Sequence, residues 1–195
     1  MSLINRLIVL EGPSGCGKST INKALSTKLE SLGNVVYSTR EPSDKFNRSN
    51  ENTMSGFSLY ELFLADRVDH VRDEILPALL RGEFVICDRY IPSTLTYQCI
   101  EGVDFEKVYS DNSQFIIPGL TVFLEVAIAQ LVKRVAARDT TTRFEQSEFR
   151  IREVEQYGIV KQRLEHEKGW NIQTINNDIY SVDDVVEMII NRINA

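Results

Sequence analysis

Short apolar runs alternate along the chain with longer segments in which apolar residues recur every three or four positions. A short apolar run is typical of a buried strand, whereas the longer period is typical of a helix with one buried side. Strands that alternate with helices predict a parallel sheet covered on both faces, with ligands at the carboxyl ends of the strands. The predicted strands span residues 6–10, 34–38, 84–87, 120–126 and 171–175.

The helical segments are predicted from the same periodicity. The longest apolar stripe lies in residues 58–81, where Pro77 is expected to introduce a kink. That stripe consists of Leu64, Val68, Val71, Ile75 and Leu79. Residues 43–57 are polar and aperiodic, so we expect a mobile loop there, and we interpret the charges of residues 148–155 as a solvated helix face. Other helices are predicted over residues 21–33, 93–99, 104–112, 127–137, 147–168 and 182–193.

The residues between the first strand and the first helix read EGPSGCGKST. They fit the pattern G-x-x-x-x-G-K-[ST], and strand, glycine loop and helix form the context that identifies a phosphate-binding loop. Glycines let main-chain N–H groups converge on phosphate oxygens, and the helix N-terminus adds positive charge. Lys18 would neutralise the β- and γ-phosphates of a nucleotide, and the Ser19 hydroxyl would bind Mg²⁺. The alternative is a glycine-rich turn that happens to precede a helix. The predicted ATP-binding residues are Gly12, Pro13, Ser14, Gly15, Cys16, Gly17, Lys18, Ser19 and Thr20.

Composition restricts the protein class further. The chain has 195 residues, 43% of them hydrophobic, which suits one domain over residues 1–195 with a full core. The net charge of −6 argues against nucleic acid as the main partner. No run of 18 apolar residues and no signal peptide are evident, so we expect neither a membrane span nor secretion. Cys16, Cys87 and Cys99 lack the spacing of a disulfide framework or a zinc site, which favours a reducing cytoplasm.

Three further groups of residues carry candidate chemistry. Asp88 and Arg89 follow the third predicted strand, where an acid usually faces Mg²⁺ in a phosphate-loop protein and an arginine can bind phosphate. The alternative is an Asp–Arg pair that only closes the end of the strand. Phe63 lies four residues before Arg67, so both would project from one helix face, which suits binding of a flat heterocycle. The alternative is a core phenylalanine beside a surface arginine.

The third group is Arg138 and Arg143, in the threonine-rich stretch RDTTTRFEQ. These arginines are compatible with a lid that closes on a transferring phosphate, but also with a solvated helix end. Spacing alone favours the solvated helix end, just as it favours a core phenylalanine and a surface arginine for Phe63 and Arg67.

Taken together, these residues resemble the thymidylate kinase family, whose members pass the γ-phosphate of ATP to dTMP. The matching segments run in family order over nearly the whole chain, and their combination is far more specific than the phosphate loop alone. They are EGPSGCGKST, TREP, ELFLADR, ILPALLRGEFVICDRYIPSTLTYQ, PGLTVFLEV and RFEQ. The resemblance implies a P-loop kinase fold with a five-stranded parallel sheet, ATP and Mg²⁺ as cofactors, and a short lid over about residues 138–147. It also implies a homodimer that packs through helices including the one that carries Phe63.

The resemblance assigns roles to individual residues. Arg40 and Arg89 would hold the acceptor monophosphate, Phe63 would stack on thymine, and Arg67 would reach the edge of the base. Ser93, Thr94, Tyr97 and Gln98 would surround the base and sugar, and Asp88 would join Ser19 at the metal. Family members without an arginine in the phosphate loop carry the catalytic arginine in the lid. The predicted catalytic residues are therefore Lys18, Arg89, Arg138 and Arg143.

Three departures from the family pattern leave the acceptor open. Ser14 stands where family loops usually carry an Asp or Glu that contacts the sugar 3′-OH. The stretch between Pro42 and Ser58 is shorter than usual, and Thr96 replaces a common small residue. A kinase for another nucleoside monophosphate or a deoxynucleoside is the nearest alternative. A GTP-binding switch is disfavoured because the N-K-x-D and D-x-x-G segments do not occur, and a non-catalytic binding protein would be revealed only by its lack of activity.

Overall fold

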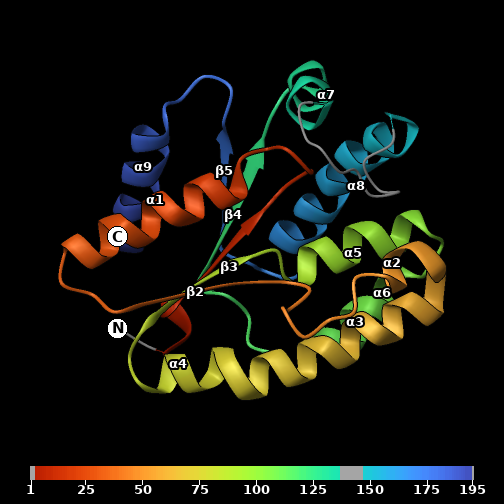
Figure 1. Ribbon diagram of the computed structural model, residues 1–195, viewed down its shortest axis with the longest axis horizontal. Coiled ribbons are helices and arrows are strands. Elements are labelled where there is room, and N and C mark those ends of the chain that lie inside the picture. The colour runs from red at the N-terminus through yellow and green to blue at the C-terminus, as the bar shows by residue number, and fades with distance from the viewer. Residues whose placement is uncertain (1–2, 137–146, 195) are drawn as a thin grey trace.

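The computed structural model describes residues 3–136 and 147–194, and Figure 1 shows their arrangement. Five parallel strands form one sheet in the order β2-β3-β1-β4-β5. This confirms the predicted fold class, a parallel five-stranded sheet with flanking helices. Each predicted strand lies within two residues of the observed one. The strands are β1 (Leu7–Glu11), β2 (Val36–Arg40), β3 (Phe84–Asp88), β4 (Leu120–Glu125) and β5 (Ile172–Asn176).

Helices cover both faces of this sheet. One face packs against α1 (Lys18–Ser31), α7 (Ile128–Ala136) and α9 (Val182–Asn194). The opposite face packs against α3 (Gly56–His70), α4 (Leu76–Leu80), α5 (Ile91–Ile100), α6 (Phe105–Asn112) and α8 (Ser147–His166). A 3-10 turn (Leu3–Arg6) precedes β1. Two separate apolar cores result, one on each side of the sheet.

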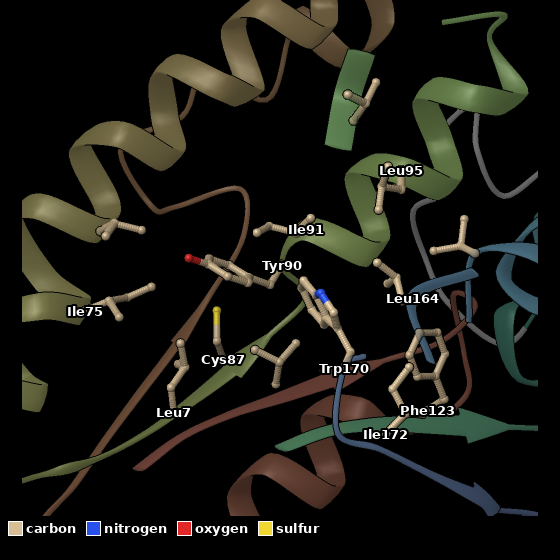
Figure 2. Close-up of a cluster of buried hydrophobic side chains, with 14 of the residues drawn as sticks. Leu7, Ile75, Cys87, Tyr90, Ile91, Leu95, Phe123, Leu164, Trp170 and Ile172 are labelled. Carbon is tan, nitrogen blue, oxygen red and sulfur yellow. The ribbon is translucent and has the colours of Figure 1, made fainter. Parts of the chain in front are cut away.

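The core beneath α3, α5 and α8 is shown in Figure 2. Leu7 and Cys87 from adjacent strands meet Tyr90 and Ile91 at the start of α5. The parallel register pairs Leu7 with Val85 and Leu10 with Asp88, so β1 and β3 end side by side. The segments that follow them, the phosphate loop and residues 89–90, are thereby held next to each other.

The long helix predicted over residues 58–81 is interrupted. A π-helical turn spans Val71–Ile75, and the Leu76 N–H donates to the carbonyl of Val71. The expected kink at Pro77 is thus preceded by a widened turn. Because proline has no N–H and crowds the turn before it, a wider turn at this place relieves that conflict. The helix therefore continues into α4 beyond the interruption.

The predicted apolar stripe of this helix is partly wrong. Val71, Ile75 and Leu79 are buried, whereas Val68 is 41% exposed. Arg67 and His70 take the inward positions instead. Periodicity could not reveal this arrangement, because two polar side chains occupy positions that the pattern reserves for apolar ones.

The prediction that residues 43–57 form only a mobile loop is also wrong in part. A short helix, α2 (Asn50–Thr53), lies within this segment, and the side chains of Phe46 and Glu51 are buried. Phe46 packs against Leu59 of α3, together with Phe63 and Tyr97. One buried aromatic residue among polar neighbours anchors the segment, and a single residue leaves no periodic signal in the sequence.

Among the described residues, no helix combines the length and the apolar character that crossing a membrane requires.

Candidate active site

The phosphate loop runs from the end of β1 to the first residue of α1. Its glycines Gly12 and Gly17 have φ angles of 134° and 103°, which favour glycine. A β-carbon at Gly12 would lie 2.5 Å from the carbonyl oxygen of Leu124, and one at Gly17 would lie 2.6 Å from Nδ2 of Asn177. The loop backbone thus packs directly against the ends of β4 and β5, which only glycine permits.

Lys18 is held inside this loop. Its Nζ donates to the carbonyl oxygens of Gly12 at 2.8 Å and Pro13 at 3.1 Å, and its residue is 6% exposed. The sequence did not indicate these structural partners. Because the ammonium group is buried next to the loop backbone, its positive charge is concentrated where phosphate oxygens would bind.

Ser19 and Asp88 are brought together from positions 69 residues apart. Ser19 Oγ donates to Asp88 Oδ2 at 2.8 Å, at the N-terminus of α1 and the carboxyl end of β3. A hydroxyl and a carboxylate are the oxygen ligands that Mg²⁺ accepts alongside substrate phosphates and water. Within the described ranges, no group of three or more His, Cys, Asp or Glu side chains could hold a metal ion. The Ser19–Asp88 pair therefore fits Mg²⁺ bound jointly with a nucleotide.

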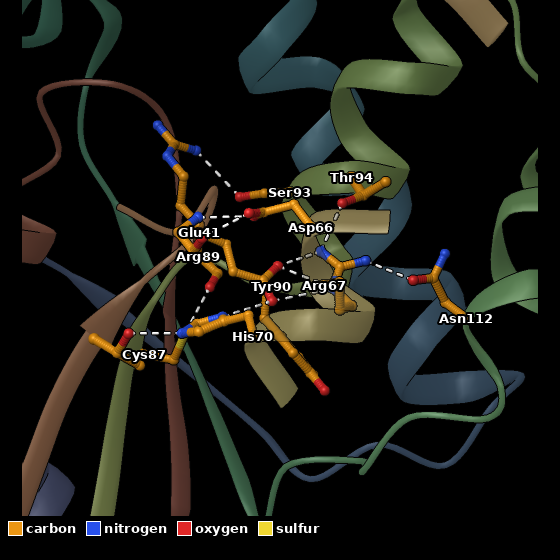
Figure 3. A network of polar contacts seen from close by, with 12 residues as sticks. Glu41, Asp66, Arg67, His70, Cys87, Arg89, Tyr90, Ser93, Thr94 and Asn112 are labelled. Atoms are coloured by element: carbon orange, nitrogen blue, oxygen red, sulfur yellow. Dashed lines mark hydrogen bonds and ion pairs between the residues drawn. The ribbon is translucent and has the colours of Figure 1, made fainter. Parts of the chain in front are cut away.

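Arg89 lies at the junction between the loop and a neighbouring cavity. Its Nη1 donates to Ser93 Oγ at 3.1 Å (Figure 3) and to the hydroxyl of Tyr157 at 2.7 Å, and its guanidinium lies over the ring of Tyr97. Arg89 is a non-glycine residue with a φ of 75°, a strained conformation that proteins retain mainly at functional sites. Desolvation opposes its charge, but the oxygens of Tyr157, Tyr97 and Glu153 favour it and raise the pKa of Arg89.

A cavity of about 240 Å³ lies between α3, α5 and the phosphate loop. Seven of the eight predicted acceptor-binding residues line it. They are Phe63, Arg67, Arg89, Ser93, Thr94, Tyr97 and Gln98. Ser14 and Arg89 also line the groove of the phosphate loop that contains Lys18 and Ser19. The cavity and the loop groove thus meet at two shared residues.

The eighth predicted residue, Arg40, lies elsewhere. Its side chain is exposed, pairs with Asp44 at 2.6 Å, and lines an open groove that also contains Ser19 and Asp88. Neighbouring residues of an extended chain point to opposite sides, so Glu41, and not Arg40, faces the cavity.

Arg67 is buried, so its interpretation as a surface charge is wrong. Its Nε lies 2.9 Å from Glu41 Oε2, its Nη2 contacts Glu41 and donates to Thr94 Oγ1 at 2.8 Å, and its Nη1 donates to Asn112 at 2.5 Å (Figure 3). Burial raises the pKa of Glu41, but Arg67 and His70 outweigh that effect and lower it. The network presents a fixed guanidinium at one end of the cavity.

Three residues of this network were missed by sequence reasoning. Glu41 is the glutamate of the TREP segment, and His70 lies three residues after Arg67, one helical turn away. His70 Nδ1 is 3.3 Å from Glu41 Oε1 and its Nε2 is 2.7 Å from Thr39 Oγ1. Asn112, at the end of α6, gave no signal in the sequence, because its partner lies 45 residues away.

Phe63 lines the cavity and is supported by Phe46. The two rings stack with centroids 4.9 Å apart and an angle of 17° between their planes. Phe46 therefore fixes the orientation of Phe63, and with it one wall of the cavity.

The buried side-chain amide of Gln98 lacks hydrogen-bond partners among the described residues. Its residue is 0% exposed, and within residues 3–136 and 147–194 neither Nε2 nor Oε1 has a hydrogen-bond partner. Leaving a buried donor and acceptor unpaired costs about 1–3 kcal/mol each. Such an amide suits a ligand that offers a complementary donor and acceptor side by side.

Glu11 and Tyr157 also escaped sequence reasoning. Glu11 is 0% exposed and accepts hydrogen bonds from the Tyr90 N–H at 2.8 Å and from Ser93 Oγ at 2.6 Å. Burial is the main reason that its pKa is raised, and these hydrogen bonds and Arg89 oppose that effect. Tyr157 Oη lies 2.8 Å from Ser93 Oγ. Both residues hold the start of α5 against the end of β1.

The prediction that residues 148–155 form a solvated face is wrong for two of its members. Arg150 is 3% exposed and Glu153 is 0% exposed. Glu153 contacts the phosphate loop and α5, so α8 turns charged residues inward. An alternating run of charges looks the same whether its members face water or a buried polar site.

Arg138 and Arg143 lie outside the described residues, as does the predicted lid except for Ser147, the first residue of α8.

The chain was compared with known proteins. The sequence model of the family described as "Thymidylate kinase" matches residues 10–189. A probable thymidylate kinase from Pyrococcus horikoshii is 39% identical over 150 residues, which cover 71% of this chain and 73% of that protein. One from Methanococcus aeolicus is 33% identical over 196 residues, covering 97% and 96%. A thymidylate kinase from Desulfotalea psychrophila is 36% identical over 153 residues, covering 74% and 76%.

Proposed function

Because the chain belongs to the thymidylate kinase family, we propose that it transfers the γ-phosphoryl group of ATP to dTMP, giving dTDP and ADP. The observation that carries this proposal is the meeting of two sites at shared residues. Ser14 and Arg89 line both the phosphate-loop groove and the cavity beside it. A donor phosphate on the loop and an acceptor phosphate in the cavity would thus face each other across Arg89, as direct phosphoryl transfer requires.

The acceptor would lie in the cavity with its base between α3 and α5. Phe63 offers a ring for stacking, held from behind by Phe46. Arg67 and the unpaired amide of Gln98 offer donors and one acceptor to the base edge. The alternating carbonyl and N–H groups of thymine suit this combination. Ser93, Thr94 and Tyr97 would complete the wall.

Catalysis would consist of positioning and charge neutralisation, without a protein nucleophile. Lys18 would hold the β- and γ-phosphates, and Arg89 would neutralise charge between the donor and acceptor phosphates. Ser19 and Asp88 would hold Mg²⁺, which would supply positive charge beside the donor phosphates. Arg138 and Arg143 would supply further positive charge at the γ-phosphate, since the phosphate loop carries no arginine.

Another nucleoside monophosphate remains the second candidate acceptor, because Ser14 supplies no carboxylate for a sugar hydroxyl. The deciding experiment is an ADP-release assay with ATP–Mg²⁺ against a panel of nucleoside monophosphates. We expect the highest kcat/KM with dTMP and loss of turnover when EDTA removes the metal. A higher kcat/KM with a different monophosphate would overturn the acceptor assignment. ADP release that no monophosphate accelerates would overturn the kinase assignment.

We also propose a homodimer that packs through α3 and α4. Val68, Leu76 and Leu80 are 41%, 39% and 65% exposed and recur on one side of this helix pair. Burying such apolar side chains against a second copy would stabilise the assembly by about 25 cal/mol for each Å². Sedimentation of the protein and of a Leu80→Glu variant tests this proposal: we expect a dimer that the charge dissociates, and a wild-type monomer at all concentrations would contradict it.

The remaining assignments follow from the same fold. One sheet connects all five strands, which supports a single domain over residues 1–195. Cys16, Cys87 and Cys99 are free thiols, which supports a reducing, cytoplasmic location. The proposed partners are the small-molecule nucleotides ATP and dTMP, with neither a nucleic acid nor a membrane.

A further inference from the structure

We propose that Glu153 of α8 is a positioning residue for the acceptor, and that it acts from a distant part of the chain on the segment of the phosphate loop that carries Ser14. This inference rests on the proposed function, because it concerns the same acceptor cavity. Glu153 would act through two residues that line the cavity, Ser14 and Tyr97.

Three elements meet at one oxygen atom of Glu153. Its Oε1 accepts the main-chain N–H of Ser14 at 3.0 Å and the hydroxyl of Tyr97 at 2.5 Å. Ser14 belongs to the phosphate loop and Tyr97 to α5, whereas Glu153 lies 139 residues after Ser14. The carboxylate therefore fixes the distance between the loop that would hold the donor and the helix that would hold the acceptor.

The second oxygen of Glu153 gives independent support. The residue is 0% exposed, and Oε2 has no hydrogen-bond partner in the part of the chain that the structure describes. Burying a carboxylate is costly unless all of its hydrogen-bonding capacity is used. An apolar residue at this position of α8 would cost the fold less. The buried charge is therefore better explained by binding or catalysis than by folding.

The charge of Glu153 also acts on neighbouring groups. It favours the charged form of Arg89, whose guanidinium lies 5.3 Å above the ring of Tyr97. Burial raises the pKa of Tyr97, so the phenol keeps its proton and donates a hydrogen bond to Glu153. Tyr97 in turn stacks on Phe149 of α8, with centroids 5.9 Å apart. A loss of the Glu153 charge would weaken its hydrogen bonds with Tyr97 and Ser14 together, on the side of the cavity nearest the phosphate loop.

The test compares Glu153→Gln, which keeps the shape and removes the charge, with Glu155→Gln, a control at an exposed glutamate of the same helix. We expect Glu153→Gln to lower kcat/KM for the acceptor about tenfold, a change of roughly 1.4 kcal/mol, and to leave the KM for ATP within about twofold. Calorimetric titration with dTMP should show the same selective loss of affinity. The Glu155→Gln control should match the wild type in every measurement.

A double-mutant cycle separates positioning from a general structural effect. If Glu153 acts through Tyr97, then Tyr97→Phe combined with Glu153→Gln should lower acceptor kcat/KM no further than the more damaging single change. Thermal unfolding is measured on each variant. Should Glu153→Gln fail to fold, Tyr97→Phe still tests the contact, because it removes one hydroxyl and should alone weaken the acceptor selectively.

Several outcomes would overturn the inference. These are unchanged acceptor kinetics and affinity in Glu153→Gln, an equal loss for ATP and acceptor, or fully additive losses in the cycle. A foldable Tyr97→Phe that matches the wild type would have the same consequence. Failure of the proposed function is distinct: it would appear in the wild-type protein as preference for an acceptor other than dTMP, and the variants would then be compared on that acceptor.

Discussion

Glu41 and Arg67 form a buried ion pair in which the guanidinium Nε lies 3.2 and 2.9 Å from the two carboxylate oxygens. The pair joins the chain just after β2 to α3 and lines one end of the proposed acceptor cavity. Arg67 keeps its charge because Glu41 outweighs the opposing effect of burial and raises its pKa. Arg67 would therefore meet the base as a guanidinium of fixed orientation, and Glu41 supplies that orientation.

Replacing Glu41 with Gln should destabilise the protein and weaken binding of the acceptor nucleotide. Removing one partner of a buried ion pair costs about 3–5 kcal/mol, because it leaves the other charge uncompensated. We expect a loss of that order in the free energy of unfolding, measured by denaturant titration at neutral pH, with a raised KM for dTMP. The matched control is Glu61→Gln, which changes an exposed glutamate of α3.

The same pair predicts a pH dependence. The pKa of Glu41 is lowered from 4.5 in the folded state, so its contribution to stability is present above about 4.5 and is lost as the pH falls through the lower, folded value. The stability difference between the wild type and Glu41→Gln should therefore shrink as the pH falls below about 4.5. A difference that stays constant or grows in that range would contradict the assignment.

Lys18→Ala should abolish phosphoryl transfer while the protein still folds. The ammonium group is needed to neutralise donor phosphates, and its contacts with the carbonyl oxygens of Gly12 and Pro13 stabilise the loop only locally. Turnover is measured by ADP release and folding by circular dichroism. A variant that keeps most of its kcat would exclude the proposed phosphate-loop mechanism.

Phe63→Ala should lower the affinity for the acceptor nucleotide and leave the affinity for ATP nearly unchanged. Stacking of a base on an aromatic side chain is worth about 1–3 kcal/mol in nucleic-acid binding, which sets the expected scale. Phe46→Ala should act in the same direction but less strongly, because Phe46 supports Phe63 and does not line the cavity itself. Calorimetry with each nucleotide measures both effects. If either variant loses ATP binding or unfolds, its phenylalanine is a residue of the structural core.

Arg143→Ala, and to a smaller extent Arg138→Ala, should lower kcat far more than it raises the acceptor KM. An arginine that contacts charge developing at the γ-phosphate contributes only in the transition state, and its loss costs on the order of 3 kcal/mol. Steady-state kinetics with dTMP varied provides the measurement. An intact kcat with a raised KM would instead place these arginines among the binding residues.

Because this chain has Ser14 in its phosphate loop, the sugar 3′-OH of the acceptor should contribute less to kcat/KM than in relatives with an Asp or Glu at that position. A hydrogen bond from the 3′-OH to a neutral serine hydroxyl is about half as strong as one to a carboxylate. The kcat/KM values of dTMP and its 3′-deoxy analogue should therefore differ by less than about tenfold. Ser14→Asp should widen that difference, and more so when combined with Glu153→Gln, because Glu153 Oε1 lies 3.0 Å from the Ser14 N–H and would repel a second carboxylate. A large difference in the wild type would show that another residue contacts the hydroxyl.

The sequence by itself determined the sheet and the phosphate loop. Apolar runs predicted each of the five strands to within two residues of its observed position, because strands buried on both faces have continuous hydrophobic sequences. Gly12, Gly17, Lys18 and Ser19 were recognisable because phosphate binding needs these residue types at fixed spacing along one local segment. The thymidylate kinase resemblance followed from several such local segments in order.

Which polar residues are buried, and which residues they pair with, became clear only from the three-dimensional packing. Arg67 could have been a surface charge, Phe46 part of a loop and Glu153 part of a solvated face, and their sequence surroundings are the same in either case. Their partners lie far away: Glu41 is 26 residues from Arg67, and Ser14 is 139 residues from Glu153. A buried charge is stable only where the fold supplies a partner, and such pairings depend on contacts in space that neither periodicity nor a local motif records.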